Sequence, residues 1–238
     1  MMKMKMKIIS ISLDLVFFLT SQGVTQSAKP AYPSMPPLEQ YLMNRNTEIA
    51  LARSSAPESI ARDAEVLVFT RHGFETAVKG TNGFVCLVAR SWSTNYDDPE
   101  FWNPKLRAPI CYNAIAARSQ VPETIKRTQL VLAGASPTQA SNAVKAAIES
   151  KELPIAEPGS MSYMLSKDTY LSDQMGHWYP HLMFYVPQTD LKLWGAGLPG
   201  SPVMGFNFPD EHLTIFLIPL ARWSDGKPSP SPSEGHSH

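Results

Sequence analysis

Three polar side chains near residue 72 have the residue types that acid–base chemistry needs. Arg71 and His72 follow an apolar segment, and Glu75 comes three positions after His72. An imidazole and a carboxylate can exchange protons with a substrate, and a guanidinium can bind an anionic group. We therefore identify His72 and Glu75 as candidate catalytic residues and Arg71 as a candidate ligand-binding residue. The structural alternative is a polar bend between two strands, with Glu75 in an ion pair with Arg90.

His177 and His181 form a second candidate site. On a helix, this spacing of four would place both imidazoles on one face, as a metal site requires, but Pro180 disfavours a helix. In a strand the same spacing separates them by about 13 Å, so a shared ion requires a bend at Pro180. We predict His177 and His181 as metal ligands and His181 as a third catalytic candidate. The alternative is two histidines that hydrogen-bond to backbone.

Aromatic residues are concentrated in segments with loop-like composition. Trp102 belongs to the long segment 91–110, and Trp178, Tyr179 and Trp194 follow later in the chain. Aromatic side chains on loops above a rigid sheet commonly form a ligand pocket. We predict Trp102, Trp178 and Tyr179 as ligand-binding residues for a small apolar or aromatic molecule. The alternative is that these side chains cover the core.

The composition excludes one class of function. The 238 residues carry 21 basic and 21 acidic side chains, so the chain is not a strongly basic protein that binds nucleic acid through its phosphates. Residues 195–200 match the glycine pattern of dinucleotide sites, but Pro199 interrupts the helix start that such a site needs. The sequence therefore identifies no cofactor.

The first 27 residues have the pattern of a secretory signal peptide. Lysines at 3, 5 and 7 precede an apolar stretch at 8–20, and small residues follow at 25 and 27. We expect cleavage after Ser27 or Ala28, a secreted or periplasmic location and no membrane attachment after cleavage. Asp14 interrupts the apolar stretch, which leaves an uncleaved anchor as the alternative.

If the chain is exported, its two cysteines are expected to form a disulfide. Cys86 and Cys111 form the one pair available within the chain, and an oxidising compartment favours a disulfide between them. Such a bond closes a loop of about 25 residues and stabilises the fold by roughly 3 kcal/mol on the loop-entropy model. Two buried free thiols are the alternative.

The mature chain is expected to form one α+β domain with a mainly antiparallel sheet packed by several helices. A proline-rich arm at 28–37 precedes the domain at 38–223, and a Ser/Pro/Gly-rich tail at 224–238 is expected to be disordered. The expected helices are 38–53, 58–64, 122–133 and one from Ser136; the expected strands are 65–70, 74–79, 84–90, 161–165, 181–186 and 213–220.

Asn82-Gly83 is a strong hairpin signal between two of these strands. A two-residue turn there pairs residues whose numbers sum to 165, which places Glu75 opposite Arg90 and Lys79 opposite Cys86. The sheet is therefore expected to have a central Asn-Gly hairpin.

Arg71-His72-Gly73 resembles the motif of histidine phosphatases, in which the histidine accepts the phosphoryl group. The resemblance covers these three residues. A strand pattern follows them where that family has a loop and a helix, and His212 lacks the context of the family's second histidine.

Three longer motifs together resemble an uncharacterised family of secreted bacterial proteins. They are Gly80-Thr81-Asn82-Gly83-Phe84-Val85-Cys86, Tyr163-Met164-Leu165 and His181-Leu182-Met183-Phe184-Tyr185-Val186-Pro187. The resemblance spans roughly residues 48–223. It implies an exported bacterial domain in which the Gly-Thr-Asn-Gly turn and its cysteine are structural, and it transfers no catalytic residue.

Two functional hypotheses follow. The first is an exported domain that binds a small apolar or aromatic ligand through its aromatic loops. The second is an exported hydrolase-like or metal-dependent enzyme that uses His72, Glu75, His177 and His181. The second requires these side chains to lie together in the folded protein, because metal ligands sit about 2 Å from the ion.

Overall fold

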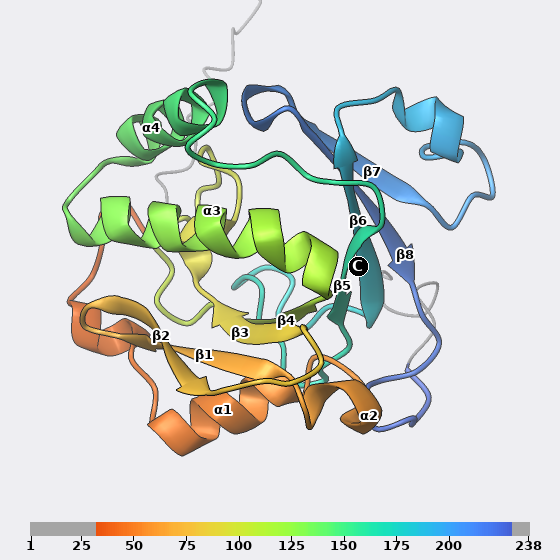
Figure 1. The fold of residues 1–238 in the computed structure, drawn as a ribbon, viewed down its shortest axis with the longest axis horizontal. Helices are drawn as coiled ribbons and strands as arrows, with labels where there is room; N and C mark the ends of the chain where they lie inside the picture. Colours follow the sequence, from red (N-terminus) through yellow and green to blue (C-terminus); the bar gives the residue numbers. More distant parts are fainter. Residues whose placement is uncertain (1–31, 230–238) are drawn as a thin grey trace, which may run out of the picture.

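The computed structural model describes residues 32–229 and contains an eight-stranded sheet (Figure 1). The order is β2-β1-β3-β4-β5-β6-β8-β7, and every neighbouring pair is antiparallel except β1 and β3. The predicted α+β class with a mainly antiparallel sheet is confirmed. The strands are β1 Glu65–Thr70, β2 Gly73–Val78, β3 Val85–Ala89, β4 Ala108–Tyr112, β5 Ser160–Met164, β6 His181–Pro187, β7 Met204–Phe208 and β8 Leu213–Pro219.

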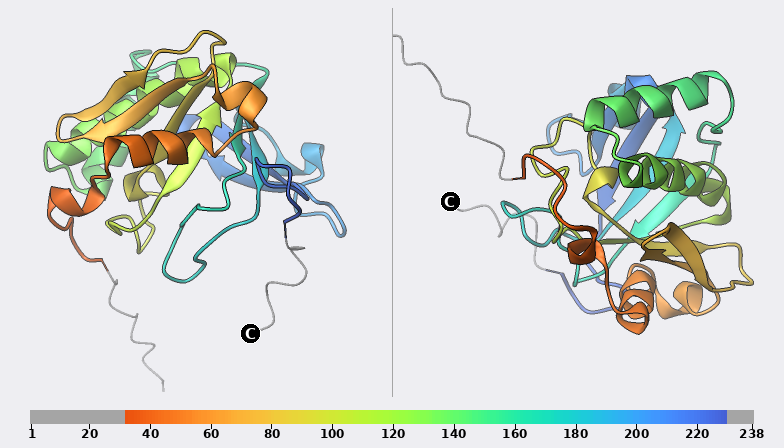
Figure 2. Two further views of the ribbon diagram at one scale, coloured as in Figure 1. Left: turned by 90° about the horizontal axis from the view of Figure 1, so that it is seen from below. Right: turned by 90° about the vertical axis from the view of Figure 1, so that its left-hand side faces the viewer.

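Helices cover both faces of the first half of the sheet. In Figure 2, α1 and α3 lie on opposite sides of the strands, and each helix packs against β3 and β4. The 3-10 helices are η1 Leu38–Tyr41, η2 Ser91–Ser93, η3 Leu191–Trp194 and η4 Pro209–Glu211; the α-helices are α1 Arg45–Arg53, α2 Glu58–Ala61, α3 Ala114–Leu132 and α4 Pro137–Glu149.

The ends of the chain differ in part from expectation. The expected signal peptide, residues 1–27, lies outside the described residues, as do residues 230–238. The expected disordered tail includes residues 224–229, but these residues form a hydrogen-bonded turn. In this turn the Trp223 N–H donates to the Lys227 carbonyl, and the Ser224 N–H donates to the Leu165 carbonyl in the body of the protein.

Local capping explains two helix boundaries. The Ser136 hydroxyl accepts from the Gln139 N–H and the Gln139 side chain accepts from the Ser136 N–H, which confirms the capping box at the start of α4. The expected helix 38–53 is instead divided into η1 and α1. Asn44 causes this break, because its side chain accepts from two backbone N–H groups and so starts a new helix.

The hairpin expected at Asn82-Gly83 is wrong. β2 pairs with β1 through a two-residue turn at Arg71-His72, and β3 lies on the other side of β1 in the parallel direction. Residues 79–84 cross the start of β1, where Glu65 N–H donates to the Phe84 carbonyl. The apolar strand β3 is thereby buried between two neighbours, while the polar strand β2 takes the edge, as each composition favours.

The expected Glu75–Arg90 ion pair is consequently wrong as well. Glu75 is exposed on β2 and accepts a hydrogen bond from the Thr70 hydroxyl at 2.9 Å. Arg90 is buried and binds the buried Glu48 of α1 at 2.8 Å. The Arg90 Nε also donates to the Tyr41 carbonyl, and Glu48 Oε1 accepts from the Phe69 N–H. One ion pair therefore connects η1, α1, β1 and the end of β3.

The predicted disulfide is confirmed. Cys86 of β3 and Cys111 of β4 are directly paired in the sheet and are bonded to each other, with their Cα atoms 4.0 Å apart. Both side chains are fully buried beneath α1 and α2, in a cluster with Ala52, Val66 and Val88. The covalent bond therefore lies inside the core on the α1 side of the sheet.

Gly80 provides a test of the crossover. A Cβ atom at this position would lie 2.1 Å from the Glu65 backbone nitrogen, so either the crossover or β1 must move in Gly80→Ala. We expect Gly80→Ala to lower the free energy of unfolding by about 3 kcal/mol, measured by urea denaturation. The control is Gly134→Ala, where φ is +87° but no atom lies within 4 Å; we expect a loss of about 1 kcal/mol there. Equal losses in both variants would contradict the crossover.

The Arg90–Glu48 pair predicts a large and recoverable loss of stability. Arg90→Met leaves the Glu48 charge buried and unpaired, and we expect it to reduce the free energy of unfolding by about 3–5 kcal/mol. Adding Glu48→Gln removes that charge and should restore part of the loss. Arg62→Met breaks the exposed pair with Asp63 and should change stability by less than about 1 kcal/mol. A double variant less stable than Arg90→Met would contradict this account.

Candidate functional site

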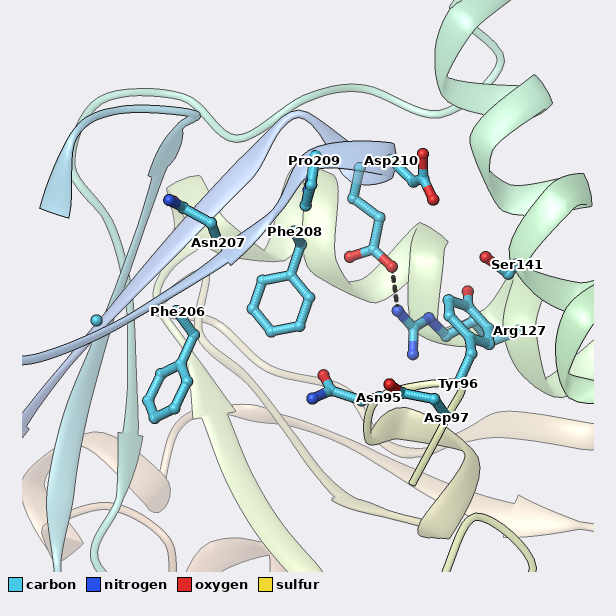
Figure 3. A pocket seen from close by; sticks show the side chains of 12 residues that line it. Asn95, Tyr96, Asp97, Arg127, Ser141, Phe206, Asn207, Phe208, Pro209 and Asp210 are labelled. Carbon is cyan, nitrogen blue, oxygen red and sulfur yellow. Dashed lines mark hydrogen bonds and ion pairs between the residues drawn. The ribbon is translucent and has the colours of Figure 1, made fainter. Parts of the chain in front are cut away.

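One candidate site is a cleft of about 570 Å³ between β7, η4, α3 and the loop after η2 (Figure 3). We call it the β7–α3 cleft. Its walls come from four parts of the chain that are remote in sequence, namely the loop after η2, α3, α4 and the run from β7 into η4, and only the folded protein brings them together. The residues that line it are Asn95, Tyr96, Asp97, Arg127, Ser141 and the run Gly205–Glu211.

One wall is apolar because β7 alternates. Phe206 pairs with Ile215 and Phe208 pairs with Leu213, so the two phenylalanines share one face of the strand. Phe208 packs against the main core, whereas Phe206 is 42% exposed. Figure 3 shows both rings on the same side of the cleft. β7 is the edge strand of the sheet, and α3 does not cover it. The face of β7 that carries the two phenylalanines is therefore left partly uncovered.

The opposite wall contains a buried arginine between two carboxylates. The Arg127 guanidinium donates to Glu211 from η4 (Figure 3), and its Nε lies 3.0 Å from Glu123 Oε1, one helical turn earlier in α3. It also donates to the Thr94 carbonyl, and its carbon lies 4.2 Å from the centre of the Tyr96 ring. These contacts attach η4 and the loop after η2 to α3, and they form the polar end of the cleft.

Burial and like charge shift the proton affinities in this cluster. Desolvation, followed by the charge of Glu211, raises the pKa of Glu123 to about 7. Burial also raises the pKa of the Tyr96 hydroxyl, which has no hydrogen-bond partner among the described residues. Two carboxylates therefore share one guanidinium, with a neutral phenol beside them. Of these groups, Glu211 and Tyr96 line the cleft, so a hydrogen-bond donor or a cation can bind at the Glu211 carboxylate and an acceptor at the phenol.

The residues predicted around position 72 lie away from this cleft. Arg71 and His72 form the exposed turn between β1 and β2, and Glu75 lies exposed on β2. Arg71 makes an ion pair with Glu39 at 2.6 Å, and both side chains are more than half exposed. The structural alternative, a polar bend between two strands, describes this turn.

The two predicted metal ligands each contact a backbone carbonyl. His177 Nδ1 lies 2.6 Å from the Thr169 oxygen, and His181 Nδ1 lies 2.8 Å from the Tyr179 oxygen. His181 is buried at the start of β6, and burial lowers its pKa. In residues 32–229, no group of three or more His, Cys, Asp or Glu side chains has the geometry to hold a metal ion.

The histidine-based enzyme hypothesis required residues that the sheet order separates. Glu75 lies on β2, the first strand in the order, and His181 lies on β6, the sixth. Five strand spacings of about 4.8 Å place them roughly 24 Å apart along the sheet. His72 lies in the β1–β2 hairpin with Glu75, so both residues are far from His181 in the sheet.

The predicted aromatic residues are distributed over several parts of the fold. Trp102 packs edge-on against Phe101, with ring centres 4.7 Å apart, in the cluster that surrounds Trp92. Trp178 lies 5.8 Å from the His181 ring, and Tyr179 is half-buried beside it. None of the three predicted ligand-binding aromatics lines the β7–α3 cleft.

Sequence reasoning missed the residues that do line this cleft. Phe206 and Phe208 alternate with small or polar residues in the short run Met204–Phe208, a pattern that favours a strand, but the expected strands do not include this run. Glu123 and Arg127 have the spacing of an ion pair on one helix face and both lie in the expected helix 122–133, but this spacing does not distinguish a buried pair from an exposed one. The contact from Arg127 to Glu211 joins residues 84 positions apart, and no local pattern indicates it.

Comparison with known proteins adds no relative. No family model, curated protein or solved structure matches the chain. No helix among residues 32–229 is both long and apolar enough to cross a membrane.

The Glu123 cluster predicts a specific dependence of stability on pH. The folded protein keeps the Glu123 proton up to about pH 7, whereas the unfolded chain releases it near the ordinary value of 4.5. The folded state therefore holds more protons between these values, so Glu123 makes the free energy of unfolding fall as pH rises through this window. Glu123→Gln stays neutral, and its unfolding free energy should fall less between pH 5 and pH 8.

The matched control is Glu152→Gln, which changes a largely exposed glutamate paired with Lys126. Urea denaturation at a series of pH values measures both variants. We expect Glu152→Gln to follow the wild-type slope. A Glu123→Gln slope equal to that of the wild type would contradict the assigned proton.

Proposed function

We propose that this protein is an exported domain that binds a small ligand with an apolar or aromatic body in the β7–α3 cleft. The observation that carries the proposal is the position of Phe206, whose ring is 42% exposed in the same cleft as the buried Arg127–Glu211 pair. An exposed aromatic ring opposite fixed polar groups is the combination that small-molecule sites use.

The apolar wall provides most of the contact area. Phe206 and Phe208 stand on one face of β7 and offer ring faces to a flat or aliphatic group. The cleft volume of about 570 Å³ falls within the range of roughly 300–1,000 Å³ that is usual for small-molecule sites. Both rings are attached to a strand paired along its length with β8, so the wall is formed before a ligand arrives.

The polar wall would orient the ligand. Glu211 and Tyr96 offer an acceptor and a donor, and Asn95 adds an amide group at the rim. Arg127 is held by backbone carbonyls and carboxylates, so its role is to fix Glu211 and Tyr96 in position.

Three observations support export. The pattern of residues 1–27 is typical of a secretory signal peptide, and the buried disulfide between Cys86 and Cys111 is typical of exported proteins. The resemblance to secreted bacterial proteins agrees with both. We do not extend the proposal to a histidine-based or metal-dependent hydrolase, because the sheet order separates Glu75 from His181.

Indole is a suitable probe of the cleft, because it combines an aromatic face with one N–H donor. We expect saturable binding of indole to the purified protein in ligand-observed NMR, and we expect Phe206→Ser to weaken it by about five- to tenfold through loss of an aromatic contact. Leu193→Ser is the matched control, because Leu193 is 77% exposed and does not line the cleft. Indole binding that is absent, or weakened equally by both variants, would refute the site.

A further inference from the structure

A second, smaller cleft of about 250 Å³ lies between the N-terminal part of α1 and the end of β1. We call it the α1–β1 cleft. Leu42, Met43 and Phe69 form its apolar part, and Arg45, Glu48 and Arg71 supply its charged groups. It shares no lining residue with the β7–α3 cleft, so a ligand bound here would not depend on the ligand proposed for that cleft.

Glu48 has an unusual position in this cleft. Its side chain is 1% exposed, and Oε1 accepts hydrogen bonds from Arg90 at 2.8 Å and from the Phe69 N–H at 3.0 Å. Oε2 has no hydrogen-bond partner among the described residues. A buried carboxylate oxygen without a donor costs free energy, and Glu48 lines a cleft through which a donor can be supplied.

The charges around Glu48 limit what that donor can be. Arg90 balances Glu48 inside the protein, and Arg107 lies close enough to both to be affected by their charges. Arg45 and Arg71 lie at the cleft itself, with Glu39 paired to Arg71. The surroundings therefore carry excess positive charge. A ligand that is only a cation is repelled, and a ligand that is only an anion leaves Oε2 without a donor.

A zwitterion satisfies both conditions. We propose that the α1–β1 cleft binds a free α-amino acid with an apolar side chain, whose ammonium group donates to Glu48 Oε2 while its carboxylate faces Arg45 and Arg71. The apolar side chain would lie against Leu42, Met43 and Phe69. The volume suits such a ligand, because 250 Å³ is below the range of roughly 300–1,000 Å³ for larger molecules.

Isothermal titration calorimetry of the purified full chain tests the charge requirement with three matched probes. L-leucine carries both charged groups, isoamylamine carries the ammonium alone and 4-methylpentanoate carries the carboxylate alone. We expect saturable binding of L-leucine and at least tenfold weaker binding of the other two. Equal binding of all three probes, or no saturable binding of L-leucine at millimolar concentration, would overturn the proposal.

Variants at the rim keep the test independent of folding, because Glu48 also supports the core. Arg45 is exposed, so Arg45→Gln should leave the fold intact and weaken L-leucine binding at least fivefold, and Arg45→Lys should recover part of it. Arg62→Gln, a change at an exposed arginine outside the cleft, should have no effect. Amide NMR shifts on adding L-leucine should centre on Phe69 and Thr70. Shifts centred on Phe206 and Phe208 would assign the binding to the other cleft and overturn the proposal.

Discussion

The buried charge of Arg90 is the constraint on which the first half of the fold depends. Its guanidinium is fully enclosed and is bound by Glu48, by the Tyr41 and Val88 carbonyls and by the Phe69 ring, 5.0 Å from its carbon. A buried guanidinium without these partners would be strongly destabilising. The segments that supply them, η1, α1 and β1, must therefore assemble around the end of β3 together. This requirement explains why a polar helix with two arginines and a glutamate lies against an apolar sheet face.

Helical cover divides the sheet into two structural parts. Between α1 and α3, the strands β1, β3 and β4 are buried on both faces, crossed by the Gly80 segment and joined by the disulfide. Beyond β5 the helical cover becomes thinner, and β7 ends the sheet with an exposed phenylalanine. A covalently braced half therefore adjoins a sheet edge that the helices leave uncovered. Binding sites at the margins of rigid sheets follow this rule in general.

The sequence allowed prediction of features that depend on neighbouring residues. β1 was predicted with its observed bounds from its apolar run, and the start of α4 from Ser136 and Gln139. The disulfide was predictable because the chain has only two cysteines and is expected to be exported to an oxidising compartment. Asn82-Gly83 lies in a bend in which the Phe84 N–H donates to the Asn82 side chain, and this bend belongs to the crossover from β2 to β3 and not to the expected hairpin. The choice between hairpin and crossover depends on which strand can be buried on both sides, and neighbouring residues do not determine this. The expected helix 122–133 begins later than α3, because Pro122 lies inside that helix and does not start it.

The two clefts use the same motif with opposite electrostatic outcomes. In each, a buried arginine lies over an aromatic ring and binds a carboxylate: Arg90 with Phe69 and Glu48, Arg127 with Tyr96 and Glu211. Around Arg127 there are two carboxylates for one guanidinium, so the excess charge is negative whenever Glu123 is ionised. Around Glu48 there are two nearby guanidinium groups for one carboxylate, so the excess charge is positive. These charges lie in the interior, where solvent screens them little. The sign of the excess charge at each cleft is therefore set by buried residues, and exposed side chains contribute less to it. Under the two proposals, one small domain presents two clefts whose surrounding charge differs in sign.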